Sequence, residues 1–267
     1  MPFLKKRGEK KGENGKVLVI GGSKDYIGAP ALAGLAALRT GIDLVVIAAP
    51  EKTAWLINSY SPDLITKKFE GDFFNWDNVK DIIELAEEFD AVLIGNGLGL
   101  EESTKDFVRE VVERTTTPLV IDADAIKALA GAEVDNAIFT PHEKEFEILT
   151  GDKLPKDLKE KAASIHVYAK KRLVFLLKGP TDIIASNTEI KYNKTGNNAM
   201  SIGGTGDVLA GITAGLLAQS KDLFNSAYYA AQLNGAIGDE LLKKKGIGFT
   251  ASDIIPLIPE FKRKLIK

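Results

Sequence analysis

The chain has 267 residues, of which 45% are hydrophobic and 27% are charged, and its formal net charge is −2. This length and composition are ordinary for one globular domain, which we expect to span residues 1–267. The near-neutral charge argues against nucleic-acid binding, the lack of a long apolar run argues against a membrane span, and the absence of cysteine excludes disulfides and thiolate metal sites.

Short β-branched runs alternate with helix-like segments along the chain. The basic residues before the first run predict a solvated N-terminal arm over residues 1–14, with a phosphate-binding arm as the alternative. Strands are predicted, in chain order, over residues 16–20, 43–48, 91–94, 119–121, 137–139 and 173–177. Helices are predicted over residues 31–39, 51–59, 75–89, 103–114 and 156–171. Residues 182–185 and 189–192 are predicted to pair as a hairpin around Ser186 and Asn187, and helices dominate after the polar loop 193–206.

The alternation of strands and helices predicts an α/β fold, with one mostly parallel sheet and helices on both of its faces. In such folds ligands bind where the carboxyl ends of the strands meet. Glycine-rich or polar segments follow five of the predicted strands, after Ile20, Ile94, Ile121, Phe139 and Leu177. We therefore expect these five segments to converge on one cleft.

The strongest chemical signal is the segment NNAMSIGGTGDVLAG, residues 197–211. Gly203, Gly204 and Gly206 precede an apolar stretch, residues 208–217, that is predicted to be a helix. Glycines let the backbone approach a ligand closely and present free N–H groups, and a helix N-terminus adds positive potential. The segment therefore predicts a phosphate cradle. It is not a Walker A loop, because no GK[ST] follows.

Asp207 falls in the first turn of the predicted helix. An acid at such a position is commonly a helix cap. A carboxylate beside an anion cradle is, however, electrostatically unfavourable unless it acts on the ligand. It is suited to accept a proton from a hydroxyl that attacks a phosphoryl group. From the residues alone the cap is the favoured interpretation, with catalysis as the alternative.

Three other loops have two interpretations each. GNGLG, residues 95–99, lacks the GxGxxG spacing of a dinucleotide fingerprint and is either a ligand loop or a tight turn. His142 either contacts substrate or caps a helix, and Glu145 is a candidate for holding a metal-bound water. Lys178 and the following Gly-Pro-Thr either touch nucleotide phosphates or only turn into the hairpin. The chain has two histidines, too few for a histidine-based zinc site.

Six segments, in this order, make the chain resemble the nucleotide-dependent NAD(P)H-hydrate dehydratases of the ribokinase-like superfamily. They are VLVIGGSKDYIGAPALAGLAALRTGIDLV, GNGLG, VIDADAI, TPHEKEF, LLKGPTDIIAS and GNNAMSIGGTGDVLAG. GGTGD alone is shared with related thiazole and pyrimidine kinases, whereas the early GGS…YIGAPALA segment together with TPHEKEF is much more specific. The resemblance implies a ribokinase-like three-layer α/β/α sandwich.

The resemblance also implies a lyase reaction of metabolite repair. Hydrated NADH or NADPH carries a hydroxyl on its reduced ring, and the family phosphorylates this hydroxyl and then eliminates phosphate, which restores NAD(P)H. Bacterial and archaeal members typically use ADP and leave AMP, whereas animal and yeast members typically use ATP. We expect ADP here, with Mg²⁺ bridging its phosphates. The alternatives are a kinase of a small alcohol, such as a thiazole or pyrimidine vitamin precursor, and a non-catalytic nucleotide-binding protein.

The resemblance assigns roles to residues of the matching motifs. Asp207 is implied as the catalytic base and as a substrate contact. The remaining contacts to the hydrate are implied for Ala29, for Gly97 or Gly99, and for His142. Contacts to ADP are implied for Lys178, Gly179, Pro180, Thr181, Asn198, Gly203, Gly204, Thr205 and Gly206. Glu145 is the candidate for holding Mg²⁺ through a water.

The chain departs from the family pattern in two motifs. GNGLG stands where the family commonly has GPGLG, and MSIGGTGD where it has MATGGTGD. Asn96 is therefore expected to change the stiffness of its loop, and Ser201 and Ile202 to alter the wall beside the cradle. Neither change removes a proposed catalytic group.

Three expectations concern the protein as a whole. Fifteen residues precede the first predicted strand, so we expect neither the epimerase domain that many relatives carry nor epimerase activity. We expect a homotetramer, with residues 226–242 either at the interface or in a buried core helix. A cytoplasmic location is the default, because the N-terminus lacks an apolar signal core.

Overall fold

The computed structural model describes residues 3, 8–10, 12–170 and 172–265. Over these residues the strands form one nine-stranded sheet in the order β3-β2-β1-β4-β5-β6-β7-β8-β9. Strands β1 to β7 are parallel, and β8 and β9 add an antiparallel hairpin at one edge. The strands are β1 Lys16–Ile20, β2 Leu44–Pro50, β3 Ile65–Phe69, β4 Ala91–Ile94, β5 Leu119–Ile121, β6 Ala137–Phe139, β7 Leu173–Leu177, β8 Asp182–Ala185 and β9 Ile190–Asn193.

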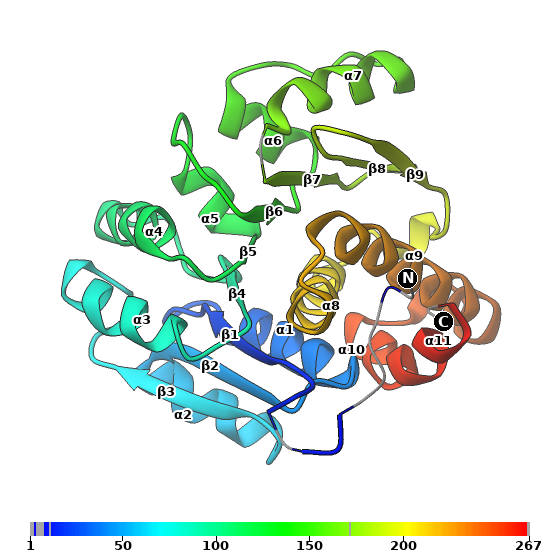
Figure 1. Ribbon diagram of the computed structural model, residues 1–267. Coiled ribbons are helices and arrows are strands. Elements are labelled where there is room, and N and C mark those ends of the chain that lie inside the picture. Colours follow the sequence, from blue (N-terminus) through cyan, green and yellow to red (C-terminus); the bar gives the residue numbers. More distant parts are fainter. Residues whose placement is uncertain (1–2, 4–7, 11, 171, 266–267) are drawn as a thin grey trace.

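Helices cover both faces of this sheet and give the three-layer sandwich (Figure 1). Successive residues of a strand point to opposite faces, so Val17 and Val19 of β1 enter one core and Leu18 and Ile20 the other. The first core includes residues of α1 Gly28–Arg39, α2 Glu51–Tyr60, α8 Thr205–Ser220, α9 Leu223–Lys245, α10 Ala251–Ile254 and α11 Ile258–Leu265. The second includes residues of α3 Val79–Ala86, α4 Glu102–Arg114, α5 Ala123–Ala128, α6 Glu143–Thr150 and α7 Leu158–Tyr168.

Helix α8 packs between α1 and α9 against the middle of the sheet (Figure 1). Its residues 208–218 are all buried, which explains the uninterrupted apolar run in the sequence. The contact with α1 requires glycine at Gly211, because a Cβ there would lie 2.1 Å from the carbonyl oxygen of Ala33. This packing fixes the N-terminus of α8, and with it the first helical turn.

Every predicted strand and the predicted hairpin are present in the structure, with ends that differ by two residues or fewer. Three elements were not predicted: β3, α5 and α6. Strand β3 lies at the sheet edge and exposes Ile65, so it shows no clean apolar pattern. Helices α5 and α6 have six and eight residues, too few for a periodic signal. Helix α8 begins at Thr205, three residues before its predicted start, and the helix predicted over residues 75–89 begins as a 3₁₀ turn, Trp76–Asn78.

The long helix that was predicted as either an interface or a core element contributes one face to the core. Ala227, Leu233 and Ile237 of α9 are fully buried within the chain itself. The homotetramer stays a prediction. Four basic residues of the predicted N-terminal arm, Lys5, Lys6, Arg7 and Lys11, lie outside the described residues. No helix in the described part of the chain combines the length and apolar character needed to cross a membrane.

Candidate active site

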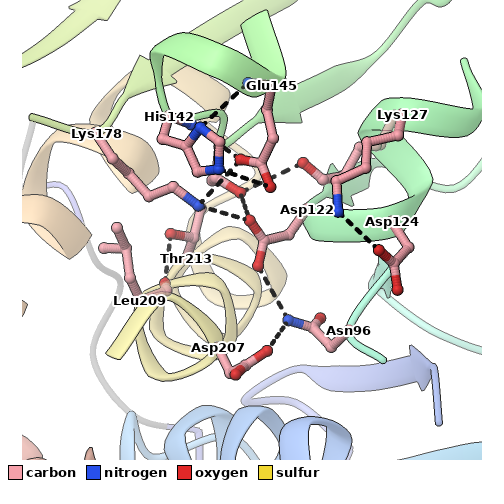
Figure 2. Close-up of polar contacts among 12 residues, drawn as sticks. Asn96, Asp122, Asp124, Lys127, His142, Glu145, Lys178, Asp207, Leu209 and Thr213 are labelled. Atoms are coloured by element: carbon pink, nitrogen blue, oxygen red, sulfur yellow. Dashed lines mark hydrogen bonds and ion pairs between the residues drawn. The ribbon is translucent and has the colours of Figure 1, made fainter. Parts of the chain in front are cut away.

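The segments that follow β1, β4, β5, β6 and β7 meet at the carboxyl end of the sheet, as predicted. The Gly22 N–H donates to the Asn96 carbonyl at 2.9 Å, which joins the first two segments. Asp122, directly after β5, accepts from Asn96 Nδ2 at 3.0 Å and from Lys178 Nζ at 3.1 Å (Figure 2). It also accepts from Thr140 Oγ1, after β6, at 2.7 Å. One buried carboxylate therefore holds four of the five loops together.

Asp207, in the first turn of α8, is joined to these loops through Asn96, whose Nδ2 donates to its Oδ1 at 2.7 Å (Figure 2). The N-cap of α8 is Gly204, and in the described part of the chain Asp207 accepts no hydrogen bond from a backbone N–H. Asp207 therefore does not cap α8 through a hydrogen bond, although it lies in the first turn as predicted. Burial raises the pKa of Asp207 to about 6; the hydrogen bond from Asn96 opposes this rise, and the charge of Asp122 adds to it. Such a carboxyl group is ionised at neutral pH and is still basic enough to take a proton from a reacting hydroxyl.

The ammonium of Lys178 lies between two buried carboxylates. Its Nζ is 3.1 Å from Asp122 Oδ1 and 3.7 Å from Glu145 Oε2. Burial works against the charge, but Asp122 and Glu145 outweigh it and raise the pKa of Lys178. A Cβ built on Gly206 would lie 3.6 Å from the Nζ. A permanent cation thus stands beside the glycine-rich N-terminus of α8, where one anion can meet both.

His142 and Glu145 form a reciprocal capping box at the start of α6. The Glu145 N–H donates to His142 Nδ1 at 3.1 Å, and the His142 N–H donates to Glu145 Oε2 at 2.9 Å. Because Nδ1 accepts, the neutral imidazole carries its proton on Nε2. The cap interpretation of His142 is therefore right, while half of its side chain stays exposed. Its contact with substrate stays a prediction.

A cavity of about 620 Å³ opens beside Lys178, a size typical of small-molecule sites. It is walled by the segment after β7, by the loop that leads into α8 and by one stretch of α9. Six of the predicted nucleotide contacts line it, and these are Lys178, Gly179, Pro180, Asn198, Thr205 and Gly206. His142 also lines it, whereas Thr181, Gly203 and Gly204 are outside its wall.

The predicted substrate contacts Ala29, Gly97 and Gly99 form a second group, at the start of α1 and on the loop that follows β4. A Cβ on Gly97 would lie 3.5 Å from the Cβ of Ala29, and the Gly99 N–H donates to Asp124 Oδ2 at 3.0 Å. Asp207 lies between this group and the cavity. It accepts a hydrogen bond from Asn96, which belongs to the same loop as Gly97, and it follows Gly206, which lines the cavity. The arrangement suits a reaction between two ligands with Asp207 between them.

The described residues contain no group of three or more histidine, aspartate or glutamate side chains that could hold a metal ion. The carboxylate of Glu145 is already used by the His142 N–H and approached by Lys178. These surroundings do not provide a resident metal site. They fit an ion that arrives with a nucleotide, since Mg²⁺ is commonly held by substrate phosphates and waters with one or two carboxylates nearby.

The sequence does not reveal three polar residues of the site. It predicts for Asn96 only a change in loop stiffness, whereas the side chain is fully buried between two carboxylates. Asp122 stands at a strand end within VIDADAI, a position that could have marked it as a site residue. Asn234, on α9, lines the cavity, and its buried Oδ1 has no hydrogen-bond partner among the described residues. Nothing in the helical pattern distinguishes Asn234 from its neighbours.

Comparison with known proteins shows which family the chain belongs to. Residues 17–260 match the family model described as NAD(P)H-hydrate dehydratase. The chain is 44% identical over 266 residues to the bifunctional NAD(P)H-hydrate repair enzyme Nnr of Pyrobaculum aerophilum, with 98% of this chain and 53% of that protein covered. It is 36% identical to the ADP-dependent (S)-NAD(P)H-hydrate dehydratase of Natrialba magadii, with 93% and 92% covered.

A solved structure gives the same likeness in three dimensions. The ADP/ATP-dependent NAD(P)H-hydrate dehydratase from Bacillus subtilis, co-crystallized with ATP/Mg²⁺, has a TM-score of 0.84 at 29% identity, with 99% of this chain and 95% of that chain covered. The chain spans about half the length of the bifunctional relatives it matches, 53% for the Pyrobaculum protein.

Proposed function

The chain belongs to the NAD(P)H-hydrate dehydratase family, and from this premise we propose that it dehydrates the S epimer of hydrated NADH or NADPH with ADP as phosphoryl donor. The products are NAD(P)H, AMP and phosphate. One observation carries the proposal: a partly buried carboxylate with a pKa of about 6, Asp207, stands in the first turn of α8 next to a glycine-rich segment and the Lys178 cation.

The first chemical step is phosphoryl transfer to the ring hydroxyl. Asp207 accepts the hydroxyl proton while the hydroxyl oxygen forms a bond to the terminal phosphorus of ADP. The bond between that phosphorus and the bridging oxygen breaks, and AMP leaves with the electron pair. The main contribution of the protein is to hold the hydroxyl oxygen in line with the phosphorus and the bridging oxygen, with the carboxylate beside the hydroxyl, because phosphoryl transfer depends chiefly on position and charge.

The second step is elimination. Hydroxide leaves a ring carbon poorly, whereas phosphate leaves well. The lone pair of the ring nitrogen displaces the phosphate, the carbon–oxygen bond breaks with its electrons going to the phosphate, and loss of a proton from the adjacent ring carbon restores the double bond of NAD(P)H. Lys178 and the N–H groups at the start of α8 stabilise the negative charge that collects on the departing phosphate.

Magnesium enters this proposal as part of the nucleotide. The Natrialba relative is named ADP-dependent, and the Bacillus structure was crystallized with ATP/Mg²⁺. We expect Mg²⁺ to neutralise the phosphate oxygens of ADP, with Glu145 contacting the ion through a water. The cavity residues Lys178, Asn198, Thr205 and Gly206 would bind the nucleotide, and the second group, with Ala29 and Gly97, would bind the hydrate.

The test is to incubate the protein with hydrated NADH, ADP and Mg²⁺ and to follow the recovery of reduced-ring absorbance together with AMP and phosphate. Asp207→Asn should still bind ADP while turnover falls by several orders of magnitude. A near-normal rate in this variant would show that another group is the base. A kinase of a small alcohol would instead leave a stable phosphorylated product, so turnover of a thiazole or pyrimidine alcohol without recovery of NADH would favour that alternative.

A further inference from the structure

The loop between β4 and α4 holds one polar side chain, Asn96, in a fixed place. Gly95 has φ +131°, and a Cβ on it would lie 1.8 Å from the Asp122 carbonyl oxygen, so only glycine allows this approach. On the other side, the Asn96 carbonyl accepts from the Gly22 N–H at 2.9 Å. Asn96 itself is fully buried. Its backbone is therefore held from two directions, and its amide has little freedom.

The amide of Asn96 joins two carboxylates that are 85 positions apart in sequence, Asp122 and Asp207. Its Nδ2 donates to Asp122 Oδ2 at 3.0 Å and to Asp207 Oδ1 at 2.7 Å (Figure 2). An amide nitrogen has two hydrogens, so both are used. Ionised carboxylates only accept, which fixes the nitrogen, and not the oxygen, on the side of the two acids.

This orientation leaves Asn96 Oδ1 buried without a hydrogen-bond partner among the described residues. A buried polar atom in this state destabilises the fold, so its presence calls for a compensating role. The two bonds of the Nδ2 supply one. They act on the carboxylate to which the proposed chemistry assigns the proton.

The two acids are held very differently. Asp122 is anchored without Asn96, because Thr140 Oγ1 donates to it at 2.7 Å and Lys178 Nζ at 3.1 Å. For Asp207, the amide of Asn96 is the single hydrogen-bond donor that the described residues supply. Asn96 thus holds the carboxylate of Asp207 in place relative to the anchored carboxylate of Asp122.

We propose that Asn96 is a positioning residue for Asp207: it ties Oδ1 to the anchored Asp122 and leaves Oδ2 as the oxygen that receives the substrate proton. This inference rests on the proposed function for its catalytic part, whereas the restraint on the carboxylate can be measured without substrate.

The charges around Asp207 determine how its pKa should change when the amide of Asn96 is removed. The groups that face it from the packed elements are Asp122 after β5, Asp124 in α5 and Lys178 after β7. The Asn96 amide lowers the pKa of Asp207, and both aspartates raise it. Without the amide the pKa rises above its present value of about 6. A larger fraction of Asp207 is then protonated at neutral pH and cannot act as a base.

The experiment compares Asn96→Leu and the smaller Asn96→Ala with wild type in the dehydration assay from pH 5 to 9. We expect kcat near pH 7 to fall about tenfold to a hundredfold, the usual range for loss of a hydrogen bond to a charged group. The acid limb of the kcat profile should move to higher pH, and KM for ADP should stay within about twofold. Asn58→Leu is the matched control, since the Asn58 Nδ2 donates to the Leu64 carbonyl at 2.8 Å, on α2.

A second measurement separates this inference from the proposed function. Carbon-13 NMR of labelled aspartate carboxyls, assigned with Asp207→Asn, follows the titration of Asp207 in the absence of substrate. We expect its midpoint to rise in both Asn96 variants and to stay unchanged in Asn58→Leu. If wild type fails to restore NADH, the proposed function falls while the titration still tests the restraint. An unchanged midpoint together with an unshifted acid limb overturns the role of Asn96, even if its variants lose activity.

Discussion

Replacing Lys178 with methionine tests the charge arrangement of the site, because the change removes a cation and keeps most of the side-chain volume. The Lys178 side chain is 22% exposed, and its partners Asp122 and Glu145 are 3% and 6% exposed. Removing one partner of a buried ion pair typically costs about 3–5 kcal/mol. Asn96 and Thr140 still donate to Asp122 in the variant, so we expect the lower end. About 3 kcal/mol corresponds to a fall in Tm of roughly 6–12 °C for a chain of this size.

The destabilisation by Lys178→Met has a defined dependence on pH. In wild type the pKa of Lys178 is raised by Asp122 and Glu145, against the effect of burial. The stability that this charge supplies is therefore fully present below about pH 10 and is lost as the pH rises through the raised pKa. The difference from wild type should thus stay constant from neutral pH up to about pH 10 and shrink above it.

Thermal unfolding followed by circular dichroism between pH 7 and 10 measures this difference. Lys244→Met is the control, because Lys244 pairs with Glu240 at 3.0 Å with 62% of its side chain exposed. Such a surface pair contributes at most about 1 kcal/mol at any pH. If Lys178→Met unfolds within about 2 °C of wild type at neutral pH, the three charges do not hold these loops together.

Three further outcomes follow from the same geometry. Because the pKa of Asp207 is about 6, kcat/KM for the hydrate should fall about tenfold per pH unit below that value, and a flat kcat/KM profile between pH 5 and 7 would exclude Asp207 as the base. Gly95→Ala should prevent folding, since its Cβ would lie 1.8 Å from the Asp122 carbonyl oxygen; soluble protein with a wild-type Tm would contradict this. Gly206→Ala places a Cβ 3.6 Å from Lys178 Nζ, an ordinary contact, so we expect a stable fold with ADP affinity lowered about tenfold or more by crowding of the cradle, as measured by calorimetry.

The parallel core of the sheet could be predicted because its strands are buried on both faces. A strand such as β1, KVLVI, then reads as a continuous β-branched run that no amphipathic helix would show. The edge strand β3, ITKKF, lacks this signature, since Ile65 and Lys67 are exposed and only Phe69 is buried. Its place in the sheet is set by pairing with β2, a contact between segments that local patterns do not record.

The site could be predicted where its chemistry depends on a local motif. The glycines before α8 and Asp207 within its first turn lie in one short segment, so spacing alone indicates a cradle with an acid beside it. The contacts of Asn96 could not be found in this way. They join residues 26 and 111 positions apart, and only the strand order brings β4 next to β5 and α8. A buried asparagine and an exposed loop asparagine look identical in the sequence.

The two acids joined by Asn96 have opposite electrostatic surroundings, and this difference determines which of them can act as a base. Asp122 has a cation at 3.1 Å and a hydroxyl donor at 2.7 Å, so its charge is satisfied and it holds the loops. Asp207 has one neutral amide donor at 2.7 Å, and burial raises its pKa to about 6. If Lys178 contacted Asp207 directly, the pKa of that carboxyl would fall and its basicity would be lost. Placing the cation on the neighbouring acid keeps Lys178 available to a phosphate and keeps Asp207 able to take a proton.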